Sequence, residues 1–122
     1  MRIFITKPFA RLMKHERLAP HHILEAAARI EKGLIDADLG GGLIKQRVAR
    51  QNQGRSGGYR FLIAYKMNEK IIFLTGFAKS ERENIDDDQV KTLKQIGGLW
   101  LAATDSMIER AIAAGELEEV KR

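Results

Sequence analysis

The stretch LGGGLIKQRVARQNQGRSGGYR, residues 39–60, decides how the centre of this chain folds. Within it Ile44 and Val48 share one parity, while Lys45 and Arg47 share the other. Side chains two residues apart point to the same face of a β-strand, about 7 Å apart along it. The alternation therefore predicts a strand with one face buried in a core and the other face carrying cations.

The predicted strand is followed by a loop and a return. Residues 51–58, QNQGRSGG, contain no apolar side chain and are rich in glycine, which is typical of a loop. An apolar segment follows, and Asn68 with Glu69 makes a tight turn into another one. The pattern predicts an antiparallel three-stranded meander. Its strands span residues 43–50, 59–67 and 70–78.

Further elements are predicted before this meander. Residues 2–6 alternate as a short first strand, which would pair at an edge of the sheet or beside the last strand. Apolar residues at helical spacing from Lys7, and again after Pro20, predict two helices. Residues 38–42, DLGGG, are predicted to form a turn.

One long helix is predicted after residue 85. Three aspartates at positions 86–88 suit its N-terminus, and Gly115 suits its end. Gly97 and Gly98 each cost roughly 1 kcal/mol relative to alanine, which close packing on the sheet or a kink would offset. Helices segregated from a sheet make an α+β fold. We expect two N-terminal helices, an antiparallel twisted sheet and a long C-terminal helix in a single domain, residues 1–122.

The composition excludes several kinds of protein. The 122 residues contain no cysteine, so neither disulfides nor thiolate metal sites can form, and this suits a reducing cytoplasm. No apolar run is long enough to span a bilayer, and basic residues interrupt the apolar ones near the N-terminus. We expect a cytoplasmic protein with no membrane partner, no metal ion and no cofactor.

Positive charge is concentrated in the middle of the chain. Residues 39–68 hold six Lys or Arg side chains and no Asp or Glu, whereas residues 81–122 hold ten acids against six bases. Such segregation is the usual footprint of a polyanion-binding face. A solvated hairpin can also carry a basic stretch, so charge alone leaves the two interpretations about level. The six cations are Lys45, Arg47, Arg50, Arg55, Arg60 and Lys66.

A phosphodiester is the ligand that this segment would suit. Lys45 and Arg47 lie side by side on their strand, Arg55 lies in the glycine-rich loop, and Arg60 begins the return strand. Converging cations of this kind would clamp a phosphate and stabilise negative charge that develops on it.

A second motif, GFAKSERENI, occupies residues 76–85. Lys79 stands at the end of the third strand of the meander, from where its side chain could reach over the sheet. Ser80 and Glu83 have the spacing of a capping box, which would explain both residues structurally. The motif is therefore informative only in combination with the first one.

Together the two motifs resemble those of the RelE superfamily of bacterial toxins, in particular its HigB-like members. The resemblance spans residues 38–95 and implies a compact sheet with two N-terminal helices. It implies a toxin that an antitoxin, typically a helix-turn-helix protein, holds inactive. When freed, such a toxin cleaves messenger RNA on the ribosome. The implied partners are therefore an antitoxin, the ribosome and messenger RNA.

The resemblance and the charge pattern assign roles to residues of this chain. Lys45 and Glu81 are alternative candidates for the base that deprotonates the 2′-OH, and Glu81 could instead orient a cation, while arginine suits charge stabilisation. Some relatives use a tyrosine near the C-terminus, but no tyrosine follows Tyr65 here. The predicted catalytic residues are Lys45, Arg47, Arg60, Lys79 and Glu81, and the predicted RNA-binding residues are Arg50, Arg55, Lys66 and Arg82.

Two other functions stay open at this point. ParE relatives share the fold and act on DNA gyrase, and an RNA-binding domain could have lost cleavage. Converging phosphate-binding cations favour the nuclease over the gyrase-directed toxin, because inhibiting a protein does not require them. His21 and His22 are adjacent at a helix start and suit a surface pair better than a metal site.

Overall fold

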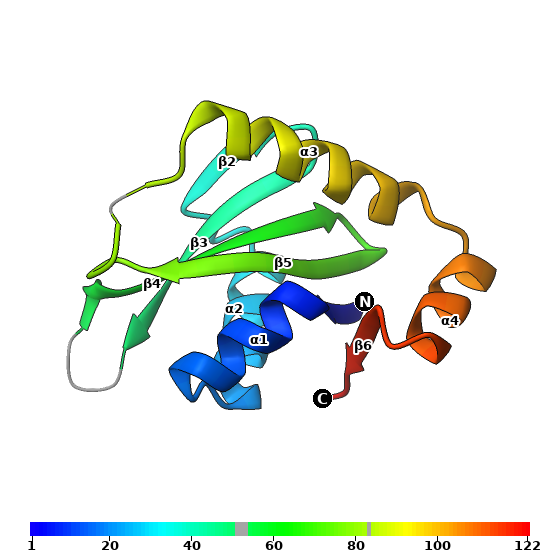
Figure 1. Ribbon diagram of the computed structural model, residues 1–122, viewed down its shortest axis with the longest axis horizontal. Coiled ribbons are helices and arrows are strands. Elements are labelled where there is room, and N and C mark those ends of the chain that lie inside the picture. The colour runs from blue at the N-terminus through cyan, green and yellow to red at the C-terminus, as the bar shows by residue number, and fades with distance from the viewer. Residues whose placement is uncertain (51–53, 83) are drawn as a thin grey trace.

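A computed structural model of the chain describes residues 1–50, 54–82 and 84–122, with residues 50 and 54–57 described by their backbone alone. Within this described part the strands form a six-stranded sheet in the order β2-β3-β4-β5-β1-β6 (Figure 1). The predicted α+β class is confirmed. The strands are β1 (Arg2–Thr6), β2 (Ala37–Gly40), β3 (Leu43–Arg50), β4 (Gly54–Lys66), β5 (Lys70–Ala78) and β6 (Leu117–Val120), and the helices are α1 (Lys7–Glu16), α2 (Pro20–Glu31), α3 (Asp87–Ala102) and α4 (Asp105–Ala113).

The predicted meander is confirmed, since β3 pairs with β4 and β4 with β5, both antiparallel. The prediction of an antiparallel sheet was wrong, because β1 lies parallel to β5 and makes the sheet mixed. A parallel pair needs a long crossover connection, and the two N-terminal helices together with the meander provide it. β6 then pairs antiparallel with the other side of β1. Of the two places predicted for the first strand, it takes the one beside the last strand of the meander.

Two predicted loops are shorter than expected. β4 begins at Gly54, so residues 54–58 of the predicted loop at 51–58 belong to this strand; Gly54 pairs with Arg50 beyond a register shift in the β3–β4 pairing, and residues 51–53 lie outside the described part. Part of the predicted turn at 38–42 belongs to β2, which pairs with β3. The turn itself needs glycine: Gly42 has φ +84°, and a Cβ there would lie 2.6 Å from Leu101 Cδ1.

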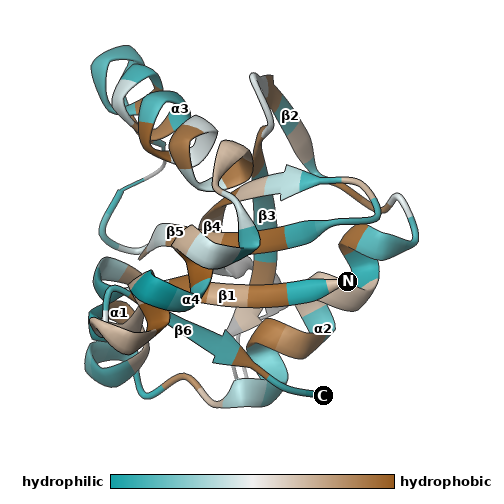
Figure 2. Cartoon of the chain, turned by 90° about the vertical axis from the view of Figure 1, so that its right-hand side faces the viewer, coloured by the Kyte–Doolittle hydropathy of each residue, from teal (hydrophilic) through white to brown (hydrophobic). Residues whose placement is uncertain are grey.

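Alternation along β3, β4 and β5 divides the sheet into two faces. Ile44, Phe61 and Phe73 belong to a core that α1 and α2 cover. Residues of the other parity, including Leu62, belong to a second core under α3 and α4. Figures 1 and 2 show the α1–α2 pair and α3 on opposite sides of the sheet. The parity of Lys45 is that of the α3 face.

The predicted long C-terminal helix is two helices and a strand. α3 ends where Lys70 Nζ donates a 2.8 Å hydrogen bond to the carbonyl oxygen of Ala103, and the side chain of Thr104 caps α4. Burial of Lys70 lowers the pKa of its ammonium. Apolar residues continue at helical spacing across this break, so the sequence pattern did not reveal it. Gly115, with φ +76°, follows the end of α4 as predicted, and β6 comes after it.

The N-terminus of α3 confirms one expectation and corrects another. Asp86 caps the helix by accepting a hydrogen bond from the Gln89 amide at 2.8 Å, and the Gln89 side chain accepts one from the Asp86 amide. The aspartate cluster therefore does begin the helix. Ser80 does not, because α3 starts seven positions after it, and its predicted partner Glu83 lies outside the described residues.

Close packing explains Gly97. α3 continues through both glycines, and Gly97 is the residue of α3 that is fully buried. A Cβ there would lie 3.2 Å from Ala64 Cβ and 3.4 Å from Leu74 Cδ1, on the sheet. A Cβ on Gly98 would meet nothing within 4 Å.

The two neighbouring glycines should respond differently to alanine. We expect Gly98→Ala to stabilise the protein by about 0.5–1 kcal/mol, because it removes a helix-interior glycine without a clash. Gly97→Ala should be less stable than Gly98→Ala by about 1–3 kcal/mol, because its methyl would lie 3.2 Å from Ala64 Cβ and require α3 or β4 to shift. Chemical denaturation of both purified variants measures the difference. Equal effects of the two substitutions would contradict the packing explanation.

Candidate nucleic-acid interface

Strand register gathers four of the predicted cations on the α3 face of the sheet. Arg47 on β3 lies opposite Arg60 on β4, and Lys45 lies two residues from Arg47 along the same strand. Arg60 in turn lies opposite Phe77 on β5, two residues before Lys79. Side chains that are opposite each other or two residues apart share a face. Residues far apart in the sequence therefore converge.

The four cations line one hollow of about 400 Å³, which we call the cation hollow. Arg60 is only 8% exposed, Lys45 and Lys79 are half-buried, and Arg47 is exposed. An anion entering the hollow would therefore meet a buried guanidinium with three more accessible cations around it. The lining residues are Asp36, Ala37, Lys45, Arg47, Arg60 and Lys79.

Asp36 is the charged lining residue that the sequence analysis did not predict. One carboxylate oxygen accepts a 2.7 Å hydrogen bond from the Arg47 amide, and the other lies 3.5 Å from the Arg47 guanidinium. The same carboxylate is 3.7 Å from Arg29 of α2. An acid in the linker before β2 has no motif or spacing to mark it. Its contacts hold Arg47 beside the hollow and offset part of the charge there.

The surroundings of Arg60 disfavour its positive charge. Burial lowers the pKa of its guanidinium, and the charge of Arg47 lowers that pKa further, whereas Asp36 raises it. The lowered pKa means that the charged form of Arg60 is destabilised by its surroundings. An incoming anion would compensate Arg60 for its lost hydration and would offset its repulsion by Arg47. The hollow is therefore electrostatically suited to a phosphate.

Comparison with known protein families identifies the family of this chain. A sequence model described as the RelE toxin of the RelE / RelB toxin-antitoxin system matches residues 1–120. This chain belongs to the RelE toxin family. No curated protein matches it. The resemblance that rested on residues 38–95 is confirmed, and this RelE-family chain is the toxin of a toxin–antitoxin system whose partner is an antitoxin.

In this RelE-family toxin, Lys45 has a partner from the second motif. Its ammonium donates a 3.3 Å hydrogen bond to Asn84 Oδ1. The amide of Lys79 donates to the Gly58 carbonyl at 2.9 Å, which continues the β4–β5 ladder and fixes where the Lys79 side chain starts. The GFAKSERENI motif therefore contributes the Lys79 cation to the hollow and the Asn84 side chain that binds Lys45.

Two further residues of that motif lie outside the hollow. Glu81 is exposed and is not among the lining residues, so the two predicted candidates for a general base are not equally placed. Arg82 lies over the Phe77 ring, 5.5 Å from its centre, and donates a 3.0 Å hydrogen bond to Gln89 Oε1. Arg82 thus belongs to a neighbouring part of the same face.

The predicted RNA-binding cations are dispersed. Lys66 ends β4 at the opposite end from the hollow, about 20 Å along the strand from Arg60, and pairs with Glu69 at 3.0 Å. The structure therefore does not bring Lys66 to the other cations. The side chains of Arg50 and Arg55 lie outside the described part of the chain.

Other candidate sites have structural explanations. The rings of His21 and His22 stack at 4.1 Å at the start of α2. Trp100 is half-buried and packs against the second core. Among the described residues, no group of three His, Cys, Asp or Glu side chains lies close enough to hold a metal ion. None of the described helices is both long and apolar enough to cross a membrane.

Proposed function

We propose that this RelE-family toxin is a metal-independent endoribonuclease that cleaves messenger RNA on the ribosome, in the cytoplasm. The cation hollow is the observation that supports the proposal. Lys45 and Arg47 reach it from β3, Arg60 from β4 and Lys79 from the segment after β5, and the hollow suits one phosphodiester. A gyrase-directed toxin would have no use for phosphate-binding cations that converge in this way.

The reaction is an internal transesterification. The ribose 2′-oxygen attacks the adjacent phosphorus, its proton passes to a base, and the bond to the 5′-oxygen breaks as that oxygen takes up a proton. The products are a 2′,3′-cyclic phosphate and a 5′-hydroxyl. Arg60 and Arg47 would stabilise the negative charge that grows on the phosphoryl oxygens, because preorganised cations act where charge develops. Lys79 would contact the same phosphate from the segment after β5.

The proton transfers are assigned from position. Lys45 lies in the hollow, beside Arg47, whereas Glu81 is outside it and would have to move to reach the 2′-OH. A general base must come within hydrogen-bond reach of its proton. We therefore assign proton transfer to Lys45 and give Glu81 no direct role. Pre-positioning of the message by the ribosome would supply the orientation that this histidine-free hollow needs.

A purified translation system tests the proposal. The toxin is added to ribosomes translating a defined message, and the RNA ends are mapped with and without ribosomes. We expect cleavage within the translated region, with 5′-hydroxyl ends, only when ribosomes are present. An intact message together with inhibited DNA supercoiling would support the gyrase-directed alternative. An intact message with retained ribosome binding would support RNA binding without cleavage.

A further inference from the structure

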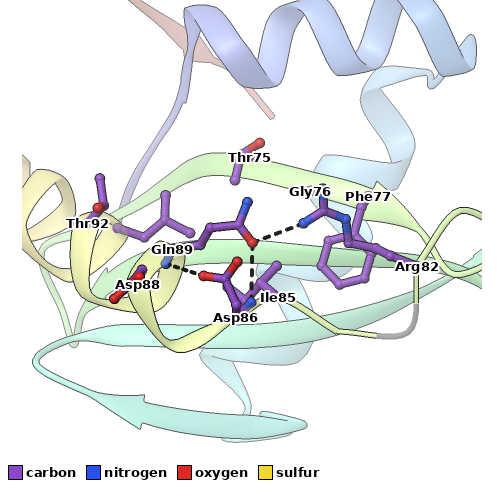
Figure 3. A pocket seen from close by; sticks show the side chains of 10 residues that line it. Thr75, Gly76, Phe77, Arg82, Ile85, Asp86, Asp88, Gln89 and Thr92 are labelled. Carbon is purple, nitrogen blue, oxygen red and sulfur yellow. Dashed lines mark hydrogen bonds between the residues drawn. The ribbon is translucent and has the colours of Figure 1, made fainter.

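A second hollow lies beside the cation hollow on the same face of the sheet, and we call it the α3 hollow. It is bounded by β5 and by the first turns of α3 (Figure 3). Its volume is about 420 Å³, which falls within the range of small-molecule pockets. The side chains that matter here are Phe77, Arg82, Asp88, Gln89 and Thr92.

Strand register joins the two hollows. Arg47, Arg60 and Phe77 stand opposite one another on β3, β4 and β5, with their side chains on one face. Adjacent strands are about 4.8 Å apart, so the row from Arg47 to Phe77 spans about 10 Å. A nucleotide whose phosphate lies against Arg60 could therefore place its base in the α3 hollow without stretching.

The surface of the α3 hollow suits a base rather than a phosphate. Phe77 is 7% exposed, and the guanidinium of Arg82 covers its ring at 5.5 Å. Unpaired RNA bases stack on aromatic rings and on guanidinium planes. Asp86 and Asp88 also line the hollow, and their negative charge would repel a phosphate. The cation hollow thus suits the phosphate of a nucleotide, and the α3 hollow suits its base.

Polar groups at the α3 hollow are arranged as a donor and an acceptor. Gln89 Oε1 accepts hydrogen bonds from Arg82 at 3.0 Å and from the Asp86 amide at 3.2 Å (Figure 3). These two bonds fix the oxygen, so the Gln89 amide nitrogen remains as an oriented donor. Asp88 is exposed, and within the described part of the chain its side chain makes no hydrogen bond or ion pair, so its carboxylate remains as an acceptor.

Guanine is the base that fits this pair. Its Watson–Crick edge presents one carbonyl acceptor next to two N–H donors, which match an amide donor and an acceptor-only carboxylate. Uracil presents a single N–H between two carbonyls and would leave Asp88 facing an oxygen. Adenine presents one amino donor beside the N1 acceptor, so it can offer the Asp88 carboxylate one N–H, whereas guanine offers that carboxylate two.

We propose that the α3 hollow binds one base of the RNA, guanine by preference, next to the phosphate held in the cation hollow, with Asp88 as the residue that determines this specificity. That the ligand is RNA rests on the proposed function. The assignment of the hollow, the base and the residue rests on the geometry of β5 and α3.

Asp87 provides a matched control for Asp88. Both are exposed acids in the first turn of α3, so alanine at either position removes one charge from the same helix end. Asp87 does not line the hollow. Asp88→Ala and Asp87→Ala are compared with the wild-type toxin in two assays. The first is ribosome-dependent cleavage of messages that differ by one base near the cut. The second is direct binding of short single-stranded RNAs that differ by the same base.

We expect the wild-type toxin to prefer guanine at one fixed position relative to the cut. Asp88→Ala should weaken this preference at least about tenfold, the size of one good base contact, while Asp87→Ala keeps it. The same ordering is expected in direct binding. A wild-type toxin without base preference in either assay would overturn the proposal, as would an Asp88→Ala variant that keeps it. Base-selective binding that Asp88→Ala removes, without any cleavage, would support the hollow while refuting the nuclease.

Discussion

Replacing Lys45 or Arg47 by alanine is expected to lower ribosome-dependent cleavage about 10²–10³-fold, the usual cost of removing a group that transfers a proton, as for Lys45, or stabilises developing charge, as for Arg47. The Arg47 substitution has a second effect: the 2.7 Å hydrogen bond from the residue 47 backbone amide to Asp36 stays, but the guanidinium that lies 3.5 Å from the other Asp36 oxygen is lost. That carboxylate would then neutralise Arg60 more strongly. Cleavage rates on a defined message measure the loss, and growth arrest on induction should disappear in parallel.

Stability and location provide the controls for this prediction. Among the described residues the Lys45 side chain makes one hydrogen bond, to the exposed Asn84, so its removal should change the free energy of unfolding by less than about 0.5 kcal/mol. Lys66→Ala removes one positive charge from the far end of β4, away from the cation hollow, so cleavage should stay within about twofold of wild type. The protein should also remain folded, because exposed ion pairs such as Lys66–Glu69 contribute little to stability. If Lys66→Ala lowered cleavage as much as Lys45→Ala while the protein stayed folded, RNA would bind to a diffuse basic surface and not to the cation hollow.

Phe9→Ala is expected to destabilise the toxin by about 3–5 kcal/mol, a large part of the stability of a small domain. Phe9 is fully buried and packs edge-on against Phe61, with ring centres 4.9 Å apart. Its ring also lies 5.2 Å from that of Phe73. Truncation removes both contacts and leaves a cavity between α1 and the strands that carry the cations on their other face. Urea denaturation of the purified variant measures the loss.

Phe9→Leu separates cavity formation from the loss of an apolar group. Leucine keeps most of the buried volume, so this variant should lose roughly half as much stability as Phe9→Ala or less. Cleavage by Phe9→Leu should remain close to wild type below its melting temperature, because α1 lies on the opposite face from the cation hollow. A Phe9→Ala variant that melts like wild type would show that α1 contributes little to the core.

Local sequence patterns predicted the middle of the fold. The parity of Ile44 and Val48 against Lys45 and Arg47 assigned faces to β3, and the structure places the first pair in the core under α1 and α2. Parity depends only on the extended backbone, so neighbouring residues carry this information. The start of α3 was predictable for a similar reason, because Asp86 interacts with its own first turn.

The missed elements depend on contacts between distant segments. The parallel pairing of β1 with β5 and the addition of β6 join the two ends of the chain to its middle. The break after α3 depends on Lys70, a residue of β5 that reaches the carbonyl of Ala103. The strand pairings leave no trace in the residues next to them, and the apolar spacing continues across the break, whose local sign is Thr104, the residue that caps α4.

The same division holds for the site. The sequence by itself determined that the centre of this protein is a hairpin with an apolar face and a basic face, because alternation and glycine-rich turns are properties of the local backbone. Only the tertiary structure decided which cations meet. Register set Arg47 against Arg60 and separated Lys66 from both, and the fold of the linker before β2 brought in Asp36. Strand register and the placing of a linker are decided by side chains packed from the whole chain, which no single segment specifies.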